Sequence, residues 1–103
     1  MKFCVSIIVL MLSRVVFAET CTQTENQLNG LVGVDSASGN LVYGSLVSEK
    51  NQCGCNFVRF KEQNADTQKS LSVLMAAKLA RSTVRVDFQD SEDCNSGWRV
   101  YLE

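Results

Sequence analysis

The cysteines constrain the fold of this chain more than any other residue type does. The chain has five cysteines in 103 residues, and four of them lie beyond residue 18: Cys21, Cys53, Cys55 and Cys94. An even set of cysteines in an exported chain predicts disulfides, here two, and four cysteines allow three pairings. A bond between Cys53 and Cys55 would close a very tight ring, so we expect each of these two to bond a distant partner.

The first 18 residues have the pattern of a cleavable secretory signal peptide. Lys2 supplies a basic start, Phe3–Leu12 is an apolar run without a charge, and Val16-Phe17-Ala18 places small residues at positions −3 and −1 of a cleavage site. The apolar run is shorter than the roughly 20 residues that a membrane-spanning helix needs. We therefore expect cleavage after Ala18, a single domain at residues 19–103, no membrane insertion after cleavage, and a secreted or periplasmic location.

The charge and composition of that domain disfavour several functional classes. The 10 basic and 11 acidic residues of the whole chain become 8 and 11 once Lys2 and Arg14 are removed, which gives a net charge of −3. Proteins that bind nucleic acid carry a basic face for the phosphates, so nucleic acid is not an expected partner. The chain contains no histidine, and the usual hydrolase triad therefore lacks its central member. We do not expect an enzyme, a cofactor or a metal.

Five segments have the composition or the alternating pattern of strands, and one has the pattern of a helix. The expected strands are Leu28–Val34, Leu41–Ser48, Cys53–Phe60, Thr83–Phe88 and Trp98–Leu102, and the expected helix is Thr67–Arg81. In the clearest strand the alternation directs Val84, Val86 and Phe88 to the core and directs Arg85 and Asp87 to solvent. The polar stretch at residues 20–29, which overlaps the start of the first expected strand, is not assigned a strand of its own.

The expected helix has an apolar surface on nearly all sides. Asp66 can accept the free N–H groups of its first turn, which marks the start of the helix. Leu71, Leu74, Met75 and Lys78 share one broad stripe, and small apolar residues occupy much of the rest. A helix of this kind is buried on more than one side, either in its own domain or against another subunit. These four residues are the candidate oligomer interface.

The order strand, strand, strand, helix, strand, strand is the element order of the OB-fold, a small, partly open barrel that mainly binds ligands. The sequence therefore predicts a mainly β domain with one helix (β-β-β-α-β-β), an OB-fold-like small barrel stabilised by two disulfides. A generic α+β roll has the same elements and stays open as an alternative.

The helix Leu71–Ala80 followed by the strand Val84–Phe88, behind a signal peptide and with a disulfide, resembles the B subunits of exported bacterial toxins of the subtilase and pertussis-like group. The resemblance implies an OB-fold, assembly into pentamers whose helices line a central pore, and binding of cell-surface glycans. It covers about a quarter of the chain, and it assigns no ligand-contacting residue. Cys53-Gly54-Cys55 has no counterpart in that group.

Two clusters allow chemistry other than binding. Two thiols as close as those of Cys53 and Cys55 could exchange disulfides if either had a lowered pKa, but an even cysteine count favours structural bonds. Zinc is disfavoured because an oxidising compartment converts thiols to disulfides and because the Cys-x-x-Cys spacing is missing. Asp90, Glu92 and Asp93 could hold calcium, but they lack the spacing of a calcium loop, and a solvated acidic loop is favoured.

Three aromatic residues suit a sugar or peptide surface: Tyr43, Trp98 and Tyr101. Trp98 alternates with Val100 and Leu102, which favours a place in the core, whereas Tyr101 shares a face with Arg99. The candidate binding residues are therefore Tyr43, Arg99 and Tyr101. We expect an exported binding or interaction domain whose partner is a glycan, a peptide or another exported protein and which could form a homo-oligomer. The alternatives are a periplasmic thiol-disulfide protein that uses the Cys-Gly-Cys motif and a structural envelope protein.

Overall fold

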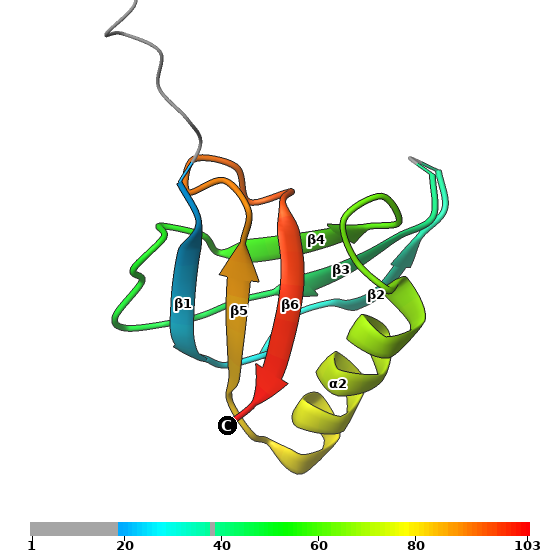
Figure 1. Ribbon diagram of the computed structural model, residues 1–103. Coiled ribbons are helices and arrows are strands. Elements are labelled where there is room, and N and C mark those ends of the chain that lie inside the picture. Colours follow the sequence, from blue (N-terminus) through cyan, green and yellow to red (C-terminus); the bar gives the residue numbers. More distant parts are fainter. Residues whose placement is uncertain (1–18, 38) are drawn as a thin grey trace, which may run out of the picture.

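The fold is a six-stranded sheet with one helix packed against it (Figure 1). The computed structural model describes residues 19–37 and 39–103, so the expected signal peptide lies outside the described residues. The strands are β1 (Cys21–Asn26), β2 (Val32–Asp35), β3 (Leu41–Ser45), β4 (Phe57–Lys61), β5 (Val84–Phe88) and β6 (Gly97–Leu102), and the helix is α2 (Thr67–Ala80). Within these described residues the expected mainly β class with one helix is confirmed.

The sheet has the order β1-β5-β6-β4-β3-β2. Neighbouring strands are antiparallel except β4 and β6, which run parallel and meet where Phe60 pairs with Gly97. A Cβ atom on Gly97 would collide with the side chains of Val58 and Phe60, so only glycine allows this close approach. The two edge strands, β1 and β2, are consecutive in the chain. Between them Gln27 exchanges two backbone hydrogen bonds with Val47, at 2.7 and 3.0 Å.

The helix begins and ends as the sequence predicts. The Asp66 side chain accepts a hydrogen bond from the Lys69 backbone N–H at 3.0 Å, which caps the first turn. At the other end Arg81 adopts a left-handed conformation with φ of 57° and ends the helix. Leu74 and Ala77 are fully buried against the inner face of the sheet, where they pack in one cluster with Phe60, Phe88 and the other core residues.

The sequence did not predict strand β1, and that expectation was wrong for a physical reason. An alternating pattern of apolar residues reveals a strand only when its buried positions are apolar, but the buried positions of β1 are Gln23 and Asn26, both 0% exposed. Other boundaries also differ. Residues 53–56 precede β4 and are not part of it, β3 ends at Ser45 and not at Ser48, and Leu28 is buried ahead of β2 instead of within a strand.

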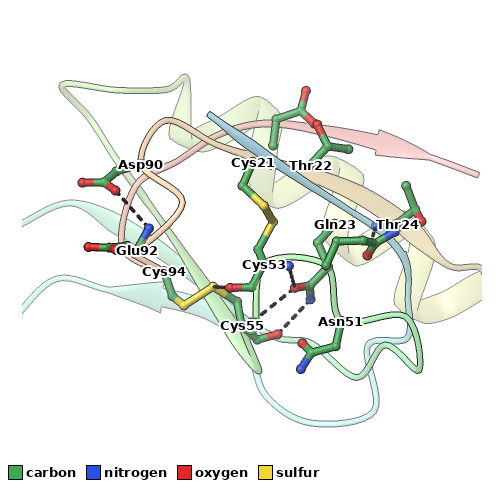
Figure 2. The surroundings of a disulfide bond; sticks show 12 residues. Cys21, Thr22, Gln23, Thr24, Asn51, Cys53, Cys55, Asp90, Glu92 and Cys94 are labelled. Carbon is green, nitrogen blue, oxygen red and sulfur yellow. Dashed lines mark hydrogen bonds between the residues drawn. A yellow bond between two sulfur atoms is a disulfide. The ribbon is translucent and has the colours of Figure 1, made fainter. Parts of the chain in front are cut away.

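The four cysteines form two disulfides at one end of the sheet, Cys21–Cys53 and Cys55–Cys94 (Figure 2). The expectation that Cys53 and Cys55 bond different distant partners is confirmed. Gly54 lies between them with φ of +69°, a conformation that glycine adopts without strain. Of the two neighbouring cysteines, Cys55 is the more deeply buried, because it is 2% exposed and belongs to the core.

A buried amide joins this double cross-link to strand β1. Gln23 Oε1 accepts hydrogen bonds from the backbone N–H groups of Cys53 and Cys55, at 3.3 and 3.2 Å (Figure 2). Gln23 Nε2 donates to the Cys55 carbonyl at 2.8 Å and to Asn26 Oδ1 at 2.7 Å. Asn26 Nδ2 in turn donates to the carbonyl of Val84 on β5 at 2.8 Å. The hydrogen-bonding capacity of both side-chain amides is therefore used inside the protein.

Replacing Gln23 by leucine should destabilise the fold strongly. Gln23→Leu keeps the volume but leaves the N–H groups of Cys53 and Cys55 and the Cys55 carbonyl without partners, each at about 1–3 kcal/mol. We expect the free energy of unfolding, measured with urea, to fall by about 3 kcal/mol or more. Gln52→Leu is the matched control, because Gln52 is exposed, and it should change the value by less than about 1 kcal/mol. Equal effects of the two substitutions would contradict the role of Gln23.

Candidate functional site

A buried carboxylate on β5 organises the outer face of strands β1, β5 and β6. Asp87 lies on the outer face, as the alternation of β5 predicts, but it is only 2% exposed, which the alternation does not predict. Thr22 Oγ1 on β1 donates a hydrogen bond to Asp87 Oδ1 at 2.8 Å. Arg85 donates two, from Nε to Oδ1 at 3.0 Å and from Nη2 to Oδ2 at 3.1 Å. Arg99 Nε on β6 lies 3.0 Å from Asp87 Oδ2. Asp87 is therefore covered by its own partners.

The ionisation of this carboxyl group follows from those contacts. Burial by itself would raise the pKa of Asp87, but hydrogen bonds from Arg85 and Thr22 and the positive charges of Arg85 and Arg99 outweigh that effect. The pKa of Asp87 consequently lies below its ordinary value. The hydrogen bond and the charge of Asp87 also raise the pKa of Arg85. Asp87 therefore holds both guanidinium groups, that of Arg85 through Nε and Nη2 and that of Arg99 through Nε.

Two aromatic rings hold the same guanidinium groups from the side. The Arg85 guanidinium carbon lies 5.1 Å from the centre of the Tyr101 ring, and that of Arg99 lies 3.8 Å from the Trp98 ring. Both distances fall within the range of cation–π attraction. The two arginine side chains stay 42% and 45% exposed, and no hydrogen bond from the described residues reaches the terminal nitrogens of Arg99. These N–H groups are therefore positioned and open to solvent.

A β-bulge directs Trp98 toward the helix. The β5–β6 register passes from the pair Asp87 and Arg99 directly to Phe88 and Gly97, so Trp98 is an extra residue on β6. It lies beside Arg99 and is partly buried. Trp98 Nε1 is buried and is the only such side-chain nitrogen or oxygen in the described part of the chain without a hydrogen-bond partner. An orphaned buried donor of this kind calls for an acceptor from water or a ligand.

A shallow hollow of about 210 Å³ lies between this strand and the start of α2. Its β6 wall is Trp98–Tyr101, and its helix side is formed by Asp66, Lys69, Ser70 and Val73. We name the surface that joins the hollow to Arg85 the β6 face. It presents two aromatic rings and three cationic side chains, Arg85, Arg99 and Lys69, a combination suited to a ligand with a flat apolar side and an acidic group.

The predicted binding residues do not all meet on the β6 face. Arg99 and Tyr101 lie there, but Tyr43 is on β3, two positions away from β6 in the sheet. Tyr43 stacks on Phe57 with ring centres 5.9 Å apart, and the Arg59 guanidinium lies 5.2 Å from the Tyr43 ring. Arg59 also donates to Asn95 at 2.8 Å. This second aromatic patch therefore has its cation engaged by the loop before β6.

Sequence reasoning did not select Arg85, Lys69 or Asp87 for the β6 face, and it assigned Trp98 to the core. The alternation of β5 places Arg85 and Asp87 on the side opposite the core, and their charges could have pointed to a paired cluster. The bulge that turns Trp98 out of its expected place in the core leaves no signal in the sequence.

The other candidate residues are placed as follows. On α2, Leu74 is 0% exposed and Leu71 is partly buried against the core, whereas Met75 is 49% exposed and Lys78 lies at the surface. In the acidic loop, Asp90 accepts the Glu92 N–H at 2.9 Å and Asp93 accepts the Asn95 N–H at 2.9 Å, so these two carboxylates cap turns. Within residues 19–37 and 39–103 no group of three or more histidine, cysteine or acidic side chains is arranged to hold a metal ion.

Replacing Asp87 by asparagine should cost stability in a way that depends on pH. Because the pKa of Asp87 is lowered by folding, its stabilisation is fully present above the unfolded value of about 3.9 and is lost as the pH falls through the lower folded value. We expect Asp87→Asn to lower the free energy of unfolding by about 1–3 kcal/mol at neutral pH. The difference from the unchanged protein should shrink as the pH falls below about 4.

Urea unfolding at a series of pH values measures this effect. Asp90→Asn is the control, because it removes one negative charge from a partly buried turn that has no arginine partner, and it should change stability by less than about 1 kcal/mol. A difference between Asp87→Asn and the unchanged protein that stays constant down to the lowest pH would show that the charge of Asp87 contributes nothing.

The described residues contain no helix with the length and apolar character needed to cross a bilayer. Comparison of the chain with protein-family models, with curated proteins and with solved structures gave no match.

Proposed function

We propose that this chain is an exported binding module whose β6 face recognises a carbohydrate that carries an acidic group. The observation that supports this most strongly is the pair of guanidinium groups held between the buried Asp87 and the aromatic rings of Tyr101 and Trp98. Guanidinium groups fixed in this way lose little freedom on binding a carboxylate or sulfate, so the contact costs little entropy.

The neighbouring hollow supplies the features that a sugar ring requires. Sugars have one face of C–H groups, which packs on aromatic rings, and a rim of hydroxyl groups, which need hydrogen-bond partners. Tyr101 and Trp98 provide the rings, and Asp66 and Ser70 provide polar groups along the hollow. Lys69 and Arg99 add positive charge on the two sides.

The proposed architecture is an OB-fold-like barrel. Its support is the pairing pattern: if β1 and β2 are counted as two halves of one bent strand, the order β1-β5-β6-β4-β3-β2 returns to its starting strand. The bridge between Gln27 and Val47 lies at the bend, and the parallel contact of β4 with β6 joins the two halves of the sheet. OB-folds bind oligosaccharides and oligonucleotides, and the negative charge of residues 19–103 favours the saccharide.

Export to an oxidising compartment is part of the same proposal. Two disulfides in a small domain are typical of secreted and periplasmic proteins. The thiol-disulfide alternative is less well supported, because Cys53 and Cys55 are bonded to two different partners and Cys55 is buried. No feature of the β6 face specifically supports the other alternative, a structural envelope protein.

The test is binding of the oxidised protein to an array of neutral and acidic glycans, followed by calorimetry with the glycans that are retained. We expect acidic glycans to be retained and neutral counterparts not. Arg99→Gln and Tyr101→Ala should each weaken binding at least about tenfold, because they remove a charged hydrogen bond and a stacking surface.

The second aromatic patch supplies matched controls. Arg59→Gln and Tyr43→Ala make the same chemical changes away from the β6 face, and both should leave the dissociation constant within about twofold. If Arg59→Gln or Tyr43→Ala abolishes binding instead, the binding site lies on β3 and β4 and not on the β6 face. Retention of peptides but of no glycan would refute the carbohydrate ligand.

A further inference from the structure

We propose that two copies of this chain associate about a two-fold axis by pairing their β2 strands antiparallel, which forms one continuous sheet across the dimer. This inference is independent of the ligand on the β6 face. It rests on the open edge of β2, on the residues at the two ends of that strand, and on the apolar surface beside it.

The backbone of β2 presents a row of free hydrogen-bonding groups. Leu31 accepts a hydrogen bond from the Ser45 N–H at 2.9 Å, so in the antiparallel pairing with β3 the odd-numbered residues bond β3. The N–H and C=O groups of Val32 and Val34 then point to the outer edge. No hydrogen bond from the described part of the chain reaches these four groups.

The opposite edge of the sheet is sealed, which makes the open edge of β2 distinctive. On β1 the Thr24 N–H donates to Gln52 Oε1 at 3.2 Å, and the Glu25 N–H donates to Glu103 Oε1 at 2.8 Å. Ser48 Oγ donates to the Thr24 carbonyl at 2.8 Å. Exposed strand edges are normally protected by lysine, proline or a bulge, and β2, with the sequence Val-Gly-Val-Asp, has none of these.

A two-fold axis through Gly33 satisfies every free group of β2. In that register Val32 opposes the partner's Val34, and the two residues exchange N–H···O=C bonds, so the pair of strands forms four bonds. Gly33 then faces the partner's Gly33. It has no side chain, and a Cβ atom there would meet nothing within 4 Å, so the two strands can approach without a clash.

The same register brings opposite charges together. The Lys78 amine contacts the carbonyl oxygen of Gly30, just before β2, and Asp35 ends the strand. Antiparallel pairing places each Asp35 opposite the partner's Leu31, beside the partner's Lys78. Each Asp35 would then lie one residue from the Gly30 carbonyl that the partner's Lys78 contacts, so that two equivalent lysine–aspartate pairs are within reach, and a parallel arrangement would instead place like groups together.

The surface that flanks this edge is apolar and uncovered. Leu31 is 77% and Val34 61% exposed. Leu71 shares a hollow with Val34, and Met75 and Leu79, which are 49% and 83% exposed, follow Leu71 at successive turns of α2. Pairing of the strands would remove these side chains from water, which is the favourable term that strand edges alone lack.

Sedimentation velocity and light scattering of the oxidised protein over a wide concentration range test the proposal. We expect twice the monomer mass at high micromolar concentration. Val34→Lys should raise the dissociation constant at least about tenfold, because it places two charges beside the axis. Val47→Lys is the matched control, because Val47 is 52% exposed and does not belong to β2. It should leave the dimer intact.

A charge exchange keeps the test decisive if Val34→Lys does not fold. Asp35→Lys and Lys78→Glu should each weaken the dimer, and the double variant should restore it, because the pairs are re-formed with reversed sign. A protein that is monomeric at high micromolar concentration, an assembly of five copies, or a dimer indifferent to both sets of variants would overturn the proposal.

Discussion

The buried side chain of Gln23 is the interaction on which the rest of the structure depends. Its amide joins three parts of the chain that are far apart in sequence: strand β1, the turn between the two disulfides, and, through Asn26, the start of β5. Thr22, the residue before it, points to the opposite side of β1 and donates to Asp87. One short polar strand therefore anchors both the cross-linked interior and the charged cluster on the outer face.

The charged cluster shows how a small domain can build a rigid binding surface without a deep pocket. The long side chains of arginine lose considerable freedom when they are ordered. Here the carboxylate of Asp87 and the rings of Tyr101 and Trp98 order the guanidinium groups during folding. A ligand then meets donors that are already in place. Asp87 is contacted by side chains from three neighbouring strands, β1, β5 and β6. The surface therefore depends on the correct pairing of these strands.

The sequence predicted the elements that follow simple periodic rules. Helix α2, strand β5 and the bonding of Cys53 and Cys55 to distant partners follow from spacing, capping and the cysteine count. Strand β1 and the burial of Asp87 could not be predicted, because polar residues occupy buried positions there and their partners lie up to 65 residues away. Of the candidate site, Arg99 and Tyr101 were found by alternation, whereas Trp98 depends on a bulge that only the paired strands reveal.

The most direct test of the β6 face uses the single tryptophan of the chain. Its indole N–H gives one resolved signal in a proton–nitrogen correlation spectrum, and the Trp98 side chain lines the hollow. Titration with acidic saccharides should shift this signal in a saturable way, neutral counterparts should not, and Arg99→Gln should move the midpoint of the titration to at least about tenfold higher concentration. An indole signal that does not move while acidic saccharides perturb residues elsewhere would contradict the assignment of the β6 face as the binding site.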